Sequence, residues 1–377
     1  MATLPEVMDS STRLVIDCDL HNGSSQDELF PYLSSYWKNL IKQQGLPQPA
    51  VPYYSPVGVI RADLDQLESG RGDSDPAYVV EHHMNPNGIS YGILTGNYYG
   101  VSILPDVLMG NAIASAANDS LAERWLGFSD RFKGSIIVNH CDPEAAVKEI
   151  DRVAPDKRFV QILICSAARI LFGQRHYHPI YEAAERHGLP VAFHPGYEGR
   201  GTTGAPTPSG YPSLYFEWHN IIPINYMAHI NSLVCEGVFE KFPGLKIVGL
   251  EGGITWLVQL MWRMDKNYKA LRSMTPWLKR PPSEYIVEHV RLSTQPLEEP
   301  PVDSDLAHVY RMVQADRTVV FSSDFPHWDG DDSRHILRSL PEPMQQRIFW
   351  QNAADLYHLD PPATSKADEH APALSRL

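Results

Sequence analysis

The stretch Leu14-Val-Ile-Asp-Cys-Asp-Leu-His21 decides the fold of this chain. Its apolar, β-branched residues favour a buried strand, and the run ends abruptly in Asp17, Asp19 and His21. Alternate side chains of a strand point to the same side, so we expect these three to project together from the end of the strand. Carboxylates and a histidine gathered in this way are typical of the start of a metal site.

Comparable apolar runs recur downstream and also end in ionisable residues. They are Leu189–His194, Leu245–Glu251 and Thr318–Asp324. A single ending of this kind is weak evidence, because a lone terminal histidine or aspartate often serves as a cap or a loop contact. On one parallel sheet, however, all four endings meet at the carboxyl edge, where barrel enzymes place their catalytic groups.

Short apolar runs alternate with segments of helical period along almost the whole 377-residue chain. The runs predict strands over residues 14–21, 88–95, 131–138, 158–165, 189–194, 244–251, 290–295 and 317–324. The segments between them predict helices over residues 106–126, 143–153, 178–187, 223–241, 256–272 and 303–313. This alternation implies an α/β fold with parallel strands, and about eight units suggest a (β/α)8 TIM-like barrel. A doubly wound open sheet is the competing architecture, but no Gly-rich dinucleotide-binding turn follows the first strand.

Two long segments interrupt the predicted pattern. Residues 22–87 form an insertion after strand 1, and residues 195–215 form a long loop after strand 5, directly behind His194. Long loops on the carboxyl face of a barrel are commonly lids or specificity elements, although solvent-exposed filler is the open alternative. We expect a single barrel domain over residues 1–360 and a flexible C-terminal tail over residues 361–377.

Charge and cysteine content narrow the classes of partner. The formal net charge of −13 argues against nucleic acid, because phosphate binding needs a basic patch. The four cysteines are scattered and none forms a CxxC pair, so reduced thiols are expected. The first residues lack the features of a signal peptide, and no apolar run approaches the length of a membrane span. We therefore expect a cytoplasmic protein that binds a small molecule and neither nucleic acid nor a membrane.

The strand endings supply one complete set of metal ligands for Zn, Mn or Fe: Asp19, His21, His194 and Asp324. Glu251 is a candidate ligand, a bridge between two ions, or a general acid/base. Taken singly, each of these residues also fits an ordinary turn, cap or buried histidine. Their joint placement at strand ends favours the metal site.

Other residues are candidates for binding a second metal ion, for hydrogen bonding to the metal ligands, or for contacting the substrate. The histidines in this group are His140, His178, His219, His229 and His327, of which His229 is also a candidate catalytic residue beside Glu251. Arg61 and Arg200, one in each long segment, are candidate partners of a substrate carboxylate, with an exposed surface arginine as the open alternative. The remaining histidines, including His82 and His83, are interpreted as surface or packing residues.

Together these motifs resemble the amidohydrolase superfamily, and within it the aminocarboxymuconate-semialdehyde decarboxylase-like group (amidohydrolase-related, family 2). The matching motifs are Ile16-Asp-Cys-Asp-Leu-His21, Val191-Ala-Phe-His-Pro195, Gly237-Val-Phe-Glu-Lys-Phe-Pro-Gly-Leu-Lys-Ile-Val248, Glu251-Gly-Gly-Ile-Thr-Trp256, Phe321-Ser-Ser-Asp-Phe-Pro-His-Trp328 and Gln351-Asn-Ala-Ala-Asp-Leu-Tyr357. The resemblance implies a metal-dependent (β/α)8 barrel that acts on small carboxylated or ring-derived substrates. It also implies a homodimer or an assembly with a homologous subunit.

Two positions depart from the pattern of that group. Its first motif is commonly His-x-His or Glu-x-His, whereas this chain has Asp19-Leu-His21, which keeps metal binding and shifts the preference towards Mn or Fe. In the decarboxylases a histidine before Gly-Gly is the acid/base, and here that residue is Glu251. A glutamate can transfer protons when burial raises its pKa, but beside a cation it more readily stays ionised and binds the metal.

Three functions remain open at this point. The first is a lyase (decarboxylase) or hydrolase with one metal ion and Glu251 as acid/base. The second is a carboxylate-bridged dinuclear Fe or Fe/Mn oxygenase that hydroxylates a small organic acid, with further histidines completing the ligand set. The third is a non-catalytic partner subunit of such an enzyme. The resemblance places the lyase or hydrolase first, since these activities prevail in the group.

Overall fold

The computed structural model describes residues 14–47, 49–51, 53–54, 59–64 and 72–362. It contains one eight-stranded sheet in the order β1 to β8, in which every neighbouring pair is parallel. The strands are β1 Val15–Leu20, β2 Ile89–Leu94, β3 Phe132–Ile137, β4 Phe159–Cys165, β5 Val191–His194, β6 Ile247–Gly249, β7 Val290–Ser293 and β8 Val319–Val320. Each lies within a predicted strand, so all eight strand predictions are confirmed.

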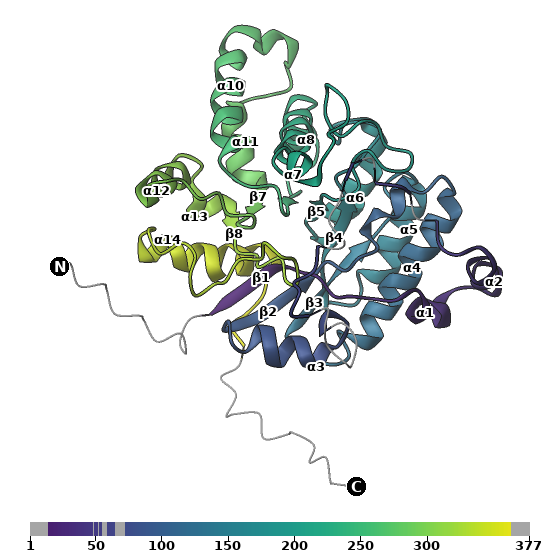
Figure 1. Ribbon diagram of the computed structural model, residues 1–377. Coiled ribbons are helices and arrows are strands. Elements are labelled where there is room, and N and C mark those ends of the chain that lie inside the picture. Colours follow the sequence, from purple (N-terminus) through teal and green to yellow (C-terminus); the bar gives the residue numbers. More distant parts are fainter. Residues whose placement is uncertain (1–13, 48, 52, 55–58, 65–71, 363–377) are drawn as a thin grey trace.

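Backbone hydrogen bonds close the sheet between β1 and the segment after β8. Cys18 N donates to Phe321 O at 2.9 Å, and His21 N donates to Phe325 O at 2.8 Å. Figure 1 shows the strands at the centre of the molecule and the helices around them. The predicted (β/α)8 barrel is therefore confirmed, and the carboxyl ends of β1 and β8 are neighbours.

The strands read as apolar runs because both of their faces are covered, as in other parallel sheets. All six residues of β1 and all seven of β4 are buried. One cluster of buried side chains includes Ile16, Leu163 and Val248, while a larger cluster joins the strands to the helices. This packing leaves polar side chains at the strand ends as the exception that needs a chemical explanation.

Each of the six predicted helices has a counterpart in the structure, which also contains helices that the sequence did not predict. The helices are α1 Gln26–Leu29, α2 Ser35–Gln44, α3 Pro76–Val79, α4 Val107–Arg124, α5 Pro143–Val153, α6 His178–His187, α7 Tyr215–His219, α8 Pro223–Cys235, α9 Val238–Lys241, α10 Trp256–Leu271, α11 Pro282–His289, α12 Asp303–Met312, α13 Ala315–Thr318, α14 Glu342–Gln346 and α15 Asn352–Tyr357. The helix predicted over residues 223–241 is wrong in one respect, because it divides into α8 and α9. Gly237 separates them with a left-handed φ of 72°, which a helix cannot accommodate.

The insertion after strand 1 and the loop after β5 lie side by side. Tyr215 N donates to Tyr54 O at 2.7 Å, which joins α7 to the insertion. Arg61 N donates to Pro326 O at 3.0 Å, which joins the insertion to the segment after β8. The two long segments therefore meet near the carboxyl ends of the strands.

The predicted tail over residues 361–377 lies almost wholly outside the described residues, so it stays a prediction, as does the single domain over residues 1–360. Within the part of the chain that is described, no helix is both long enough and apolar enough to cross a membrane.

Candidate metal centre and active site

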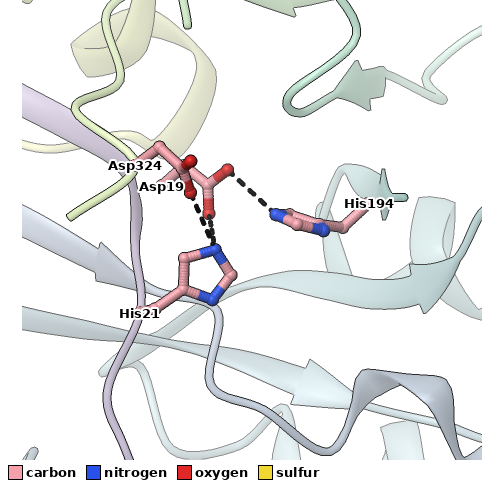
Figure 2. Close-up of side chains that lie close together, drawn as sticks. All are labelled: Asp19, His21, His194 and Asp324. Carbon is pink, nitrogen blue, oxygen red and sulfur yellow. Dashed lines mark ion pairs between the residues drawn. The ribbon is translucent and has the colours of Figure 1, made fainter. Parts of the chain in front are cut away.

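Four side chains from β1, β5 and the segment after β8 converge at one place (Figure 2). They are Asp19, His21, His194 and Asp324, and one ligand atom of each lies within 4.8 Å of the others. His21 Nε2 is 3.1 Å from Asp324 Oδ1, and His194 Nε2 is 3.2 Å from Asp19 Oδ2. All four residues are buried. The barrel thus brings together the four side chains that the strand endings singled out.

The free atoms of this cluster fit a divalent cation. Asp19 Oδ2, His21 Nε2, His194 Nε2 and Asp324 Oδ2 are buried and have no hydrogen-bond partner among the described residues. An unsatisfied buried polar atom costs about 1–3 kcal/mol, so four on the side chains of one cluster call for a shared partner. Two imidazoles and two carboxylates are a suitable ligand set for Zn, Mn or Fe.

Further hydrogen bonds orient three of these four side chains. His21 Nδ1 lies 2.9 Å from Gly96 O, and His194 Nδ1 lies 2.9 Å from Pro195 O. Since a carbonyl oxygen only accepts, each Nδ1 carries a hydrogen, so Nε2 is the nitrogen of each ring that can bind a metal once it is unprotonated. Thr95 Oγ1 donates to Asp19 Oδ1 at 2.7 Å, which leaves Oδ2 of that carboxylate towards His194.

Asp17 differs from the expectation that it projects together with Asp19 and His21. Its carboxylate instead accepts hydrogen bonds from Ser323 N at 2.9 Å and from Ser323 Oγ at 2.5 Å. The pairing of β1 with β2 is irregular between Asp17 and Leu20, so the simple alternation of side chains breaks at this point. Only the last two ionisable residues of the opening stretch reach the cluster.

Glu251 lies at the edge of the cluster, just beyond β6. Its Oε2 is 3.1 Å from His194 Nε2, and its backbone is left-handed with φ 55°. Burial, followed by the negative charges of Asp324 and Asp19, raises the pKa of Glu251 well above its ordinary value. The carboxyl group therefore favours its protonated form in the metal-free site.

His327 also reaches the site. Its Nδ1 is 2.7 Å from Asp324 Oδ1, and it belongs to a second, overlapping group with His21, Glu251 and Asp324 whose ligand atoms lie within 4.8 Å of one another. Burial alone raises the pKa of Asp324, but His327 and His21 more than offset burial and hold that pKa well below its ordinary value. Asp324 is thus kept ionised, which is the form in which a carboxylate can bind a cation.

His219 and Asp329 form a pair opposite Glu251. His219 Nε2 is 3.3 Å from Asp329 Oδ2 and 3.8 Å from Glu251 Oε1, and Gln295 Nε2 donates to Asp329 Oδ2 at 3.1 Å. The sequence marked His219 only as one of several secondary histidines, and it gave no signal for Asp329. The pair is assembled by α7 and by the loop after β8, which are distant in the chain.

Three predicted secondary histidines have partners elsewhere. His140 Nε2 is 2.8 Å from Ser102 Oγ, and His178 Nδ1 is 2.9 Å from Lys241 Nζ. His229 Nε2 is 2.9 Å from Ser166 O, while Phe172 N donates to its Nδ1 at 3.3 Å. Both nitrogens of His229 are thus occupied by backbone groups, which suits a structural role better than proton transfer.

The two predicted substrate arginines differ in their surroundings. Arg61 is about half exposed and pairs with Asp63 at 2.8 Å. The Arg200 guanidinium lies 5.6 Å from the centre of the Tyr197 ring, and its Nε is buried without a hydrogen-bond partner in the described structure. Arg200 is therefore the arginine with spare hydrogen-bonding capacity.

We expect His229→Gln to make folding less sensitive to acid. Burial lowers the pKa of His229 from 6.5 to about 4, so this imidazole stays neutral in the folded protein and takes up a proton in the unfolded chain. Between about pH 6.5 and pH 4 the unfolded state therefore binds more protons than the folded state. Lowering the pH through this range reduces the free energy of unfolding by up to roughly 3 kcal/mol. Glutamine keeps both hydrogen bonds without titrating. Urea unfolding at pH 7 and pH 5 measures the difference, and equal losses in both proteins would contradict it.

A (β/α)8 barrel that gathers two histidines and two aspartates at the carboxyl ends of its strands has the architecture of a metal-dependent barrel enzyme. The family model described as Amidohydrolase matches residues 16–359. The chain belongs to the amidohydrolase family, as its motifs led us to expect.

Similar proteins include decarboxylases. A gamma-resorcylate decarboxylase from Polaromonas sp. (strain JS666) is 27% identical over 296 residues, which cover 74% of this chain and 86% of the relative. The structure of a dihydroxybenzoic acid decarboxylase from Polaromonas sp. JS666, with bound manganese and the inhibitor 2-nitroresorcinol, is similar with a TM-score of 0.63 and 22% identity over 92% of this chain and 97% of that one. For a 5-carboxyvanillate decarboxylase from Sphingomonas paucimobilis the TM-score is 0.66, with 22% identity over 93% of this chain and 100% of that one.

Proposed function

We propose that this protein is a divalent-metal-dependent decarboxylase that removes CO2 from a small, hydroxylated aromatic carboxylic acid. The observation that carries the proposal is the convergence of four buried, unpartnered ligand atoms in a chain of the amidohydrolase family. The activity named for the Polaromonas relative gives the reaction class, because the similarity extends over 86% of that protein. Manganese is the metal we propose, since a carboxylate replaces the first histidine of the family motif.

Asp19, His21, His194 and Asp324 would hold the metal ion. Once bound, a divalent cation supplies positive charge that polarises and orients oxygen atoms of the substrate. Burial of all four ligands excludes water from their side of the site. Because the Nδ1 atoms of both histidines are held by backbone carbonyl groups, the ligand geometry is fixed before the substrate arrives.

The reaction itself replaces the bond between a ring carbon and its carboxylate with a carbon–hydrogen bond. The carboxylate leaves as CO2, and the electron pair that stays on the ring carbon takes up one proton. We assign this proton transfer to Glu251, whose carboxyl lies 3.1 Å from His194 at the edge of the ligand cluster. His219, held by Asp329, faces the same carboxyl at 3.8 Å and would orient it or a ring hydroxyl of the substrate.

His219→Phe is expected to lower kcat by about 10- to 100-fold, because this is the effect of losing one hydrogen bond to a charged group in the transition state. Phenylalanine keeps the ring contacts that His219 makes with Tyr215 and Trp328 and removes the nitrogen that faces Asp329. Metal content should not change, because His219 is outside the ligand set. Steady-state kinetics with metal analysis of the same samples measures both effects, and an unchanged kcat would remove His219 from the mechanism.

Arg200 is the proposed partner of an anionic group on the substrate. Its buried Nε lacks a hydrogen-bond partner in the part of the chain that is described, whereas Arg61 already pairs with Asp63. A guanidinium can bind a carboxylate with two parallel hydrogen bonds, which fixes its orientation. A substrate with a carboxylate therefore suits the loop after β5.

The experiment that tests the function is an assay for CO2 release with the manganese-loaded protein. The substrates are 2,6-dihydroxybenzoate and 5-carboxyvanillate, with benzoate as the control that lacks a ring hydroxyl. We expect turnover of at least one hydroxylated acid and none of benzoate. If the fully loaded protein released no CO2 from any hydroxylated benzoate, the proposed reaction would be wrong.

We also propose that residues 1–360 act as one enzyme unit, that the unit is a homodimer and that it works in the cytoplasm. The family match over residues 16–359 supports the first point. All four cysteines lie in the described part of the chain and are free thiols, which suits a reducing compartment. Light scattering of the purified protein measures the oligomeric state.

A further inference from the structure

Three buried polar side chains lie directly behind the two aspartate ligands. They are Asp17 of β1, Ser323 before Asp324, and His83 of the short π-helical turn Val80–Met84 in the insertion. His83 Nε2 is 3.1 Å from Ser323 Oγ and 3.4 Å from Asp17 Oδ2. The decarboxylation that we propose uses none of these residues, so their burial together needs another explanation.

The Ser323 hydroxyl has all of its hydrogen-bonding capacity in use. It donates to Asp17 Oδ2 at 2.5 Å, and it accepts from Phe325 N at 3.1 Å and from His83 Nε2 at 3.1 Å. Because the serine hydrogen is given to Asp17, His83 must donate through Nε2–H. Asn87 Nδ2 lies 3.4 Å from His83 Nδ1, the nitrogen that then accepts. The directions of the hydrogen bonds are thus fixed by the partners.

Asp17 connects this group to the backbone of Asp19 and of Ser323, the residue before Asp324. Its Oδ1 accepts from Asp19 N at 3.2 Å and from Ser323 N at 2.9 Å, and Asp324 N donates to Asp19 O at 3.1 Å. The ligand Asp324 has a left-handed φ of 56°, which is uncommon for residues other than glycine. A conformation of this kind persists where the surrounding structure holds it in place. The polar group behind the ligands supplies such a restraint.

His83 also packs on the residue that follows Asp324. Its ring stacks on Phe325 with 4.2 Å between ring centres and 23° between the planes. One side chain of the insertion therefore contacts Ser323 by a hydrogen bond and Phe325 by stacking, on either side of Asp324 in the sequence. The insertion thereby restrains the ligand without touching its carboxylate.

We propose that Asp17, Ser323 and His83 form a positioning network through which the insertion sets the geometry of Asp19 and Asp324, and with it the affinity for the metal. The proposal rests on the metal centre proposed above but is independent of the reaction catalysed there. His83 is a positioning residue, since it acts through Ser323 and Asp17. The sequence alone had assigned it to the surface or to packing.

The test is a titration of the metal-free protein with Mn²⁺, compared between His83→Phe and wild type. Phenylalanine keeps a ring on Phe325 and removes the donor to Ser323. We expect the dissociation constant for Mn²⁺ to rise by about 10- to 100-fold, the usual effect of losing a group that orients a ligand. His83→Gln, whose side-chain amide restores a donor, should bind Mn²⁺ much more tightly than His83→Phe.

His82→Phe is the matched control, because His82 is the neighbouring residue of the same turn and its side chain is half exposed. This control should bind Mn²⁺ as wild type does. Ser323→Ala is a smaller change and should weaken Mn²⁺ binding as His83→Phe does. If His83→Phe does not fold, Ser323→Ala tests the positioning role in its place. If Ser323→Ala, or a folded His83→Phe, bound Mn²⁺ as tightly as the His82→Phe control, the positioning role would be overturned. The proposed metal centre would not be affected by that result. If the wild-type protein bound no Mn²⁺, the metal centre would fail and this inference with it.

Discussion

His194→Ala should remove metal binding and decarboxylation together while the barrel stays folded. His194 Nε2 is one of the four buried atoms of the cluster that have no hydrogen-bond partner among the described residues, and carboxylate oxygens of Asp19 and Glu251 lie 3.2 and 3.1 Å from it. Without the imidazole, three ligands remain, two of them like-charged carboxylates. Activity should fall by more than about 10³-fold, because a bound metal contributes several kcal/mol of charge stabilisation.

Metal analysis and CO2 release on the same purified sample measure this result. His229→Gln is the control, because it changes another buried histidine whose nitrogens bind only backbone groups, and it should keep its metal. Circular dichroism reports whether each variant is folded. If His194→Ala retained full metal occupancy, His194 would not be a ligand.

Glu251→Gln should retain the metal and lower kcat by about 10²–10⁴-fold, the usual contribution of general acid–base catalysis. Glutamine has nearly the shape of glutamate and can still lie beside His194, but its amide does not release a proton to carbon. The substitution therefore separates proton transfer from metal binding. Steady-state kinetics at saturating Mn²⁺ measures the loss. Loss of metal equal to that of His194→Ala would make Glu251 a ligand instead.

The sequence was sufficient for the fold because a parallel barrel needs strands that are buried on both faces. Such strands appear as continuous apolar runs, as in residues 158–165, where the whole of β4 is buried. The four proposed ligands could be predicted from the sequence for a related reason. Polar residues that end apolar runs, such as His194 and Asp324, must meet at the carboxyl edge once the strands are parallel.

The rest of the site depends on contacts that no local pattern encodes. The pair of His219 and Asp329 joins α7 to the loop after β8, across 110 residues of the chain. His83 reaches Ser323 across 240 residues. The irregular pairing between Asp17 and Leu20 likewise depends on β2, so the period-two expectation for the opening stretch failed at Asp17.

Stepwise loading with Mn²⁺ while CO2 release is measured tests the central claim most directly. The metal-free protein is given increasing Mn²⁺, and bound metal and decarboxylation of 2,6-dihydroxybenzoate are determined at each step. One four-ligand centre predicts that activity rises in proportion to bound metal and reaches its plateau at about one ion per chain. Activity that appeared only with two ions per chain, or an iron-loaded protein that consumed oxygen and released no CO2, would contradict the claim.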